Sequence, residues 1–159
     1  MPRAVESRRD AAATDRRVPS VALMLGAIST LPMVAGAAAI VLSDSAALRL
    51  YSHVAMVSYG ACMLSFLGAV HAGLAFRDTP LAATRLLVAA AAPALAWMSL
   101  AVGEDNGLLL MAVSFLALLA YDIAAARRGW APAWYPRLRW PLTGVTLICL
   151  LVTMRFAPL

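Results

Sequence analysis

The sequence predicts an all-α membrane protein: a compact bundle of five transmembrane helices, with the N-terminus in the cytosol and the C-terminus outside. Hydrophobic residues make up 63% of the 159-residue chain and charged residues only 13%, a composition unlike that of a soluble domain. The apolar residues also gather in five stretches, each near the roughly 20 residues that a helix needs to cross a bilayer. We expect the spans at about 18–42, 50–76, 80–102, 107–123 and 140–159.

The chain begins with a polar segment, residues 1–17, which contains five arginines and has mixed charge. We expect a disordered cytosolic tail here, followed by the bundle at 18–159. The segment also resembles the start of a signal peptide, with Ala-Gly-Ala at 35–37 as a cleavage site. The apolar run before this tripeptide is longer than the roughly 7–15 residues of a secretory signal, so we expect the first span to be retained. Pro32 should kink this span, because proline cannot donate the helical hydrogen bond.

The second span contains most of the small and polar residues found within the spans. Small side chains recur every four residues along it, which lets helix backbones approach closely and favours helix association in lipid. We therefore expect this span to be the central helix, contacted over a wide face; a substrate groove lined by small residues is the alternative. The expected helix-packing residues are Gly60, Ala61, Ser65, Gly68, Ala69 and Gly73.

A polar connection that reads Arg-Asp-Thr-Pro at 77–80 separates the second and third spans. Thr79 is suited to cap the third span, and Pro80 to take its first helical position. Arg85 then lies in the first turn, from which its side chain can reach the membrane interface.

The sequence Gly-Glu-Asp-Asn-Gly at 103–107 predicts a tight turn, so the third and fourth spans should form an antiparallel hairpin. Asp105 or Asn106 is the expected N-cap of the fourth span. The last connection contains three of the four tryptophans and four arginines, which is typical of a membrane–water interface. Pro136 is expected to start the last helix or a short interfacial segment that leads into it.

The positions of the arginines predict the orientation. All thirteen basic residues are Arg, and eleven lie in the N-terminal tail, the second gap or the fourth gap, whereas only Arg49 and Arg155 belong to the opposite side. Cytosolic segments of membrane proteins carry an excess of Arg and Lys, which indicates an N-terminus inside and a C-terminus outside. Because the arginines adjoin apolar spans, lipid headgroups explain the net charge of +5 better than nucleic acid does.

Ionisable residues within the spans are candidates for function, because charge is costly in the bilayer. His71 and Asp122 lie near the inner ends of the second and fourth spans, hence at a similar depth. A carboxylate there needs a partner, and Arg is the natural one. We expect a cytosolic-side polar cluster of His71, Arg77, Tyr121, Asp122, Arg137 and Arg139. It is either a structural element that joins spans two, four and five, or a site for an anion, a lipid headgroup or a proton.

No cofactor and no metal are expected. His53 and His71, the only histidines, are eighteen residues apart on one predicted helix, about 27 Å by helical rise, and cannot bind the same haem iron. The cysteine and methionines of the second span are more typical of core packing than of a copper site. No closely spaced ligand cluster suggests zinc, and Ser65 faces away from His71, so no nucleophile–base pair is apparent.

Several stretches give the chain a resemblance to a known family. They read Tyr59-Gly60-Ala61 with Leu64-Ser65-Phe66-Leu67-Gly68 and His71-x-Gly73; Pro93 with Leu95-Ala96-Trp97; Tyr121-Asp122; and Trp134-Tyr135-x-Arg137-Leu138-Arg139-x-Pro141-Leu142-Thr143. In this order, over about 20–155, they resemble the DUF3429 family, whose animal members are the transmembrane protein 69 group. Ala69 and Ala72 depart from the family pattern, which commonly has Gly and Trp there, and the missing Trp argues against an aromatic-lined site.

The resemblance implies a small multi-span protein of bacterial inner membranes or mitochondria, and it implies no reaction, because the function of the family is unknown. The Ala- and Arg-rich, Lys-free composition indicates a GC-rich bacterium, so we expect a multi-pass protein of the bacterial inner membrane. We expect it to be non-enzymatic, with the lipid bilayer and another membrane protein or a second copy as partners, and no nucleic acid. The alternative is a small transporter or proton-linked carrier that uses the His/Asp/Arg cluster.

Overall fold

The computed structural model describes residues 17–77 and 83–156, except for the side chains of residues 104 and 105. All regular structure within these residues is helical, which confirms the all-α prediction. Each of the five helices is long and apolar enough to cross a bilayer, so the chain is a multi-pass membrane protein. The bounds are α2, Ser20–Leu42; α3, Ala46–Ala75; α4, Ala83–Ala101; α5, Glu104–Arg127; and α6, Tyr135–Phe156.

Two expectations fall on residues outside the described ranges. One is the disordered tail at 1–17, of which only Arg17 is described. The other is the start of the third span at Thr79 and Pro80; the described part of this span begins at Ala83.

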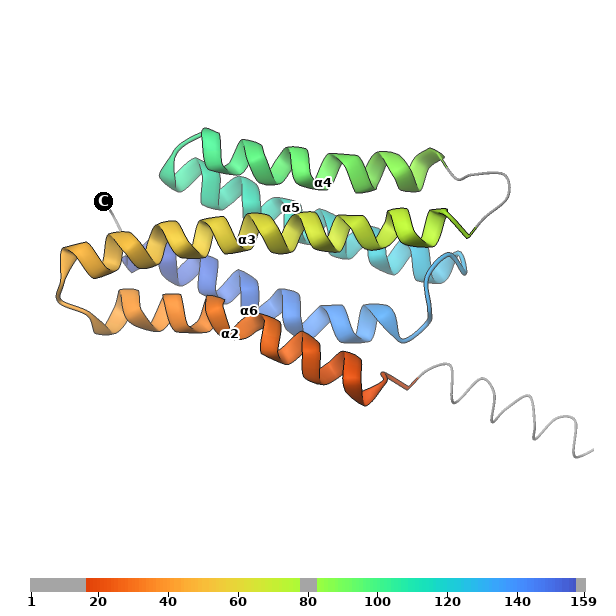
Figure 1. The fold of residues 1–159 in the computed structure, drawn as a ribbon, viewed down its shortest axis with the longest axis horizontal. Coiled ribbons are helices and arrows are strands. Elements are labelled where there is room, and N and C mark those ends of the chain that lie inside the picture. The colour runs from red at the N-terminus through yellow and green to blue at the C-terminus, as the bar shows by residue number, and fades with distance from the viewer. Residues whose placement is uncertain (1–16, 78–82, 157–159) are drawn as a thin grey trace, which may run out of the picture.

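The five helices run side by side along the long axis of the molecule, and each is antiparallel to the helix before it (Figure 1). α3 is central: it contacts α2, α4 and α5, while α6 contacts α2 and α5. One end of the bundle carries the first residues of α2 and α4, the last residues of α3 and the α5–α6 connection, and α6 ends at the opposite end (Figure 1). We call the first the arginine-rich end, because it carries Arg17, Arg77, Arg85, Arg127, Arg128, Arg137 and Arg139.

α3 and α6 begin four and five residues earlier than the apolar pattern indicates. α3 begins at Ala46 rather than near position 50, because the Ser45 side chain accepts a hydrogen bond from the Leu48 N–H (3.4 Å) and caps the helix. α6 begins at Tyr135 rather than near position 140. Pro136 lies in its first turn, where a missing N–H breaks no helical hydrogen bond. Hydropathy alone missed both starts, because capping and interfacial residues are polar or aromatic.

α5 differs from expectation at both ends. It begins at Glu104 with Gly103 as its N-cap, so the expectation that Asp105 or Asn106 caps it is wrong. Gly103 has a φ of 100°, a backbone conformation that residues with a Cβ rarely adopt, and this allows α4 and α5 to be joined within two residues. The helix continues to Arg127, beyond the expected end near position 123, and its last turn therefore carries one basic side chain, that of Arg127.

α2 contains Pro32 and bends near its middle (Figure 1). The half that follows Pro32 runs along α3, whereas the half that precedes it turns away from α3 (Figure 1). At the bend, the Tyr59 hydroxyl of α3 donates a hydrogen bond to the Ser29 carbonyl oxygen (2.7 Å). Beyond the bend, Gly36 lies so close to Met56 that a Cβ at Gly36 would overlap the methionine side chain. α2 is thus attached to α3 at and beyond the bend, and diverges from it before the bend.

The buried glycines of α3 let the neighbouring helices approach closely. A Cβ at Gly60 would overlap the Met111 sulfur of α5, and a Cβ at Gly68 would overlap the Ala92 Cβ of α4. A flexible methionine can move aside, but Ala92 can move only with its backbone. Gly68 therefore sets the distance between α3 and α4.

The other expected packing residues of α3 lie on a different part of its surface. Ala61 is buried, and Ser65 is partly exposed and donates a hydrogen bond to the Ala61 carbonyl oxygen (2.9 Å). Ala69 and Gly73 are exposed, and a Cβ at Gly73 would meet nothing within 4 Å. This row of small residues therefore faces outward over its last two turns.

Gly68→Val should lower the free energy of unfolding by about 1–3 kcal/mol, because the added methyl groups overpack the α3–α4 contact. Gly73→Val is the matched control, since it adds the same side chain to the same helix in open space and should change stability by less than about 0.5 kcal/mol. The measurement is unfolding in mixed detergent micelles, followed by circular dichroism. Equal losses in the two variants would contradict the assigned α3–α4 packing.

Candidate functional site

Four of the six residues expected in the polar cluster meet inside the bundle, near the arginine-rich end. The Asp122 carboxylate of α5 has a partner at each oxygen: His71 Nε2 of α3 lies 2.7 Å from Oδ1, and Arg139 Nε of α6 donates to Oδ2 at 2.8 Å. Tyr121 packs edge-on against the His71 ring, with ring centroids 4.8 Å apart and an interplanar angle of 81°. We call His71, Asp122 and Arg139 the triad; it joins α3, α5 and α6.

The helix directions explain why the triad residues share one depth. α3 and α5 both run towards the arginine-rich end, and α6 runs away from it (Figure 1). His71 and Asp122 lie within about one and a half turns of the ends of their helices, and Arg139 about one turn after the start of α6. The constant rise of an α-helix therefore brings the three side chains to the same level.

The triad is closed to the surroundings of the bundle. His71 and Asp122 are 0% exposed and Arg139 is 3% exposed. Transferring a charge into such an environment is costly unless the charge is paired and hydrogen-bonded, and Asp122 meets both conditions. As a carboxylate paired with Arg139, Asp122 only accepts hydrogen bonds, so His71 Nε2 carries the proton in their shared bond.

Within the triad and the neighbouring Tyr121, three polar atoms have no hydrogen-bond partner among the described residues. They are His71 Nδ1, Tyr121 Oη and Arg139 Nη2, and all three are buried. An imidazole with one nitrogen bound to a carboxylate and the other unpartnered can take up a proton at one nitrogen and release a proton from the other. The triad thus has the geometry of a structural ion pair and one feature of a proton site.

The other two residues expected in the cluster, Arg77 and Arg137, are exposed. Arg77 lines a separate pocket of about 730 Å³ together with Arg85 and Trp130. Arg85 does not extend to the interface as expected: it is buried, its guanidinium lies 4.9 Å from the centre of the Trp130 ring, and its Nη1 donates to the Leu74 carbonyl oxygen at 3.4 Å. Trp130 belongs to the α5–α6 connection, so this contact joins the connection to α4.

The remaining histidine and cysteine side chains, which could bind a metal ion, lie away from the triad. His53 is buried nearer the opposite end of α3; of the two cysteines, Cys62 is exposed on α3 and Cys149 is buried in α6. Within residues 17–77 and 83–156, no three His, Cys, Asp or Glu side chains are grouped so that they could hold a metal ion.

The motif stretches noted in the sequence supply all of the triad, since His71, Asp122 and Arg139 each lie in one of them. A family model described as a protein of unknown function (DUF3429) matches residues 18–155, most of the chain. The chain belongs to the DUF3429 family. No match was found among curated proteins or among solved structures. DUF3429 membership supports the multi-span fold, and it assigns no reaction to the triad.

Two buried hydroxyl groups of this DUF3429 protein lie beside the triad and were not among the residues predicted from the sequence. Tyr135 lies one turn before Arg139 on α6 and is 9% exposed, and Thr143 lies one turn after it and is 1% exposed. Neither hydroxyl has a hydrogen-bond partner among the described residues. Their four-residue spacing from Arg139 puts all three on one helix face, and this spacing was the signal available in the sequence.

Asp122→Asn should lower the free energy of unfolding of the DUF3429 protein by about 3–5 kcal/mol, because it leaves the Arg139 charge buried without a counter-charge. Arg139→Met should be similarly costly, since it leaves the Asp122 charge with only His71. The double variant should recover part of the loss, because both charges are removed together. The measurement is detergent unfolding of all four proteins. A loss in the double variant equal to the sum of the single losses would contradict the ion pair.

Proposed function

We propose that this DUF3429 protein is a non-enzymatic integral membrane protein that works by binding another membrane helix, from a partner protein or a second copy, in a lipid bilayer. The observation that carries the proposal is an exposed row of residues along α3, a helix that also contacts α2, α4 and α5. We call it the α3 stripe. It consists of Cys62, Phe66, Ala69, Gly73 and Phe76.

The α3 stripe has the spacing and the side chains of a helix-packing surface. Its members follow one another at intervals of four, three, four and three residues, which is the pattern that packs a second helix at a shallow crossing angle. Phe66 is 65% exposed and Phe76 is 70% exposed, and the small residues Ala69 and Gly73 lie between them. Small residues allow close backbone approach, and the rings extend the contact area, so the stripe suits association in lipid.

The triad supports a structural rather than a catalytic role for the centre of the bundle. Both oxygens of the Asp122 carboxylate are occupied by His71 and Arg139, and the exposure of all three side chains is between 0% and 3%. To bind the carboxylate, a water-soluble substrate would have to displace His71 or Arg139 from these oxygens. The role we assign to the triad is to hold α3 in the register and rotation that present the α3 stripe outward.

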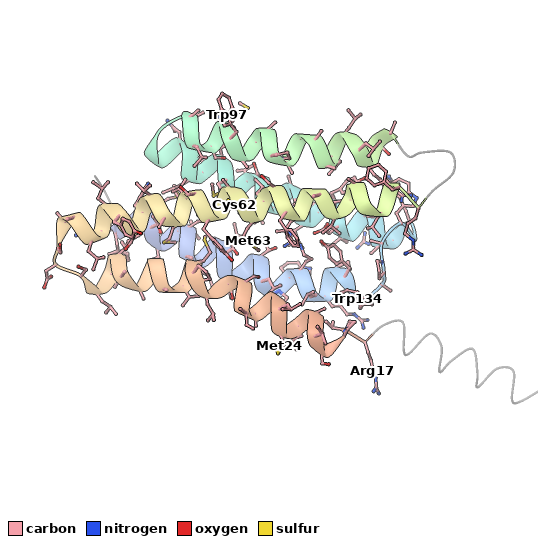
Figure 2. All side chains as sticks on the ribbon, viewed as in Figure 1. Arg17, Met24, Cys62, Met63, Trp97 and Trp134 are labelled. Atoms are coloured by element: carbon pink, nitrogen blue, oxygen red, sulfur yellow. The ribbon has the colours of Figure 1, made fainter. Side chains whose placement is uncertain are left out.

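We further propose that the protein lies in the inner membrane of a bacterium, with the arginine-rich end on the cytosolic side. Eleven of the thirteen arginines belong to that end or to the tail that precedes it, in agreement with the positive-inside rule. Trp134 at the arginine-rich end and Trp97 towards the other (Figure 2) suit the two interfaces of a bilayer.

Gly73→Leu and Ala69→Leu should prevent helix binding at the α3 stripe without unfolding the protein. Cys62 allows a direct test, because it is exposed within the stripe whereas Cys149 is buried. A benzophenone maleimide attached to Cys62 in membranes should form a photo-crosslinked product of higher mass with the unchanged stripe, and both leucine variants should reduce its yield. Mass spectrometry then identifies the product as a second copy or as another protein.

Gly144→Leu is the matched control, since a Cβ at Gly144 of α6 also meets nothing within 4 Å and the residue lies outside the stripe. It should leave the crosslink yield unchanged. The proposal fails if no protein crosslink forms at Cys62, or if the two stripe variants and the control lower the yield equally.

Proton-linked transport is the second candidate, favoured by the unpartnered His71 Nδ1 next to the His71–Asp122 hydrogen bond. In vesicles that contain the purified protein and an internal pH dye, our leading proposal predicts proton leakage no faster than in protein-free vesicles. Faster leakage that is lost in His71→Gln and kept in Gly73→Leu would instead favour the carrier.

A further inference from the structure

An apolar pocket of about 360 Å³ lies between α2, α3 and α6 in the half of the bundle nearer the arginine-rich end. Every α2 residue that lines it precedes Pro32, so the pocket opens where the bend turns α2 away from α3 (Figure 1). Its volume falls within the range of small-molecule sites, about 300–1,000 Å³. Its apolar walls include Leu25, Gly26, Met63, Phe66, Leu138 and Leu142.

The polar groups of the pocket wall are of two kinds. Ser29, Thr30 and Thr146 donate their hydroxyl hydrogens to carbonyl oxygens of their own helices, so they need no further acceptor. Tyr135 Oη and Arg139 Nη2 are buried donors that have no hydrogen-bond partner among the described residues. An unsatisfied donor in an apolar setting is costly, so an occupant with a hydrogen-bond acceptor beside these two residues would be stabilised.

Charge and depth restrict the nature of that acceptor. Arg139 is the only charged residue in the pocket wall, and its charge is already balanced by Asp122 at 2.8 Å, so a neutral acceptor fits better than an anion. Tyr135 begins α6 directly after Trp134, which lies at the end of the bundle (Figure 2). The pocket continues from there to Thr146, roughly 16 Å further along the helix. The acceptor end is therefore interfacial and the remainder lies within the hydrocarbon layer.

We propose that this pocket binds one acyl chain of a bilayer glycerophospholipid, whose ester carbonyl oxygen accepts hydrogen bonds from Tyr135 Oη and Arg139 Nη2. The groups of such a lipid match the pocket in order along the bilayer normal. Its neutral ester carbonyl lies at the headgroup boundary, level with the two donors, and its acyl chain lies deeper, level with the apolar wall. Leu25 lines the pocket and is 58% exposed. The pocket therefore opens sideways to the bilayer next to Leu25. A small change in the χ1 angle of Tyr135 or in the side-chain torsions of Arg139 brings the covered donors to the carbonyl.

This inference goes beyond helix binding at the α3 stripe and does not depend on it. Phe66 borders both surfaces, so the test uses substitutions on α2 and α6 only. If the lipid-binding proposal fails, the result of the Cys62 crosslinking experiment still stands. If the crosslinking experiment fails, the lipid-binding result still stands.

The test is native mass spectrometry of the purified full chain in detergent with dioleoylphosphatidylcholine or its ether-linked analogue, which lacks the ester carbonyls. We expect one ester lipid to be retained per chain, with a preference over the ether lipid of about tenfold, the ratio that corresponds to roughly one net hydrogen bond. Tyr135→Phe should lower this preference several-fold, because it removes one donor and keeps the ring.

Ala22→Phe fills the α2 wall of the pocket and should abolish retention of the ester lipid. Ala27→Phe is the matched control, because Ala27 is exposed on the same helix, and it should retain the lipid as the unchanged chain does. Equal retention of ester and ether lipids by the unchanged chain would overturn the proposal. So would a preference that persists in Tyr135→Phe, or equal retention by the two phenylalanine variants of α2.

Discussion

The Asp122 carboxylate is the constraint on which the packing of three helices depends. In a bilayer, apolar side chains gain little by preferring one neighbour over another, because lipid tails are as apolar as leucine. A carboxylate is different, since it has no favourable place in the hydrocarbon layer apart from its partners. With one oxygen at His71 of α3 and the other at Arg139 of α6, it sets the depth and the rotation of α3, α5 and α6 together. A slide of one turn by any of them would separate a charged pair in lipid.

α2 and α4 have no part in the triad and are held mainly by shape. α4 lies against α3 where Gly68 faces Ala92, and against α5 where a Cβ at Gly107 would overlap the Ser99 carbonyl oxygen, so its position tolerates little change. The first half of α2 has no such contact with α3, because the bend at Pro32 carries it away. The chain thus combines a rigid centre with one half-helix that diverges from it, and both proposed binding surfaces adjoin that half-helix.

All five spans and the shared depth of His71 and Asp122 follow from hydropathy and helical rise, which are local properties of the chain. The choice between Arg137 and Arg139 does not, because two residues are about 200° apart around a helix and the rotation of α6 depends on its contacts with α5. The burial of Arg85 could not be predicted from the sequence for a similar reason. It depends on Trp130, which is distant in sequence and is brought there by the α5–α6 connection. The residue types of the site and their depths are therefore predictable from the sequence, whereas tertiary packing decides which of the candidate arginines is buried in the site.

The triad is buried, whereas the α3 stripe and the apolar pocket face the bilayer, and this difference constrains where a ligand or partner can bind. A ligand at the triad would have to compete with two charge-assisted hydrogen bonds to Asp122, whereas one at the α3 stripe or in the pocket displaces only lipid tails. Phe66 belongs to both of these surfaces, so an acyl chain in the pocket would restrict the ring that a docking helix contacts. The other residues of the two surfaces are distinct, so neither binding event requires the other.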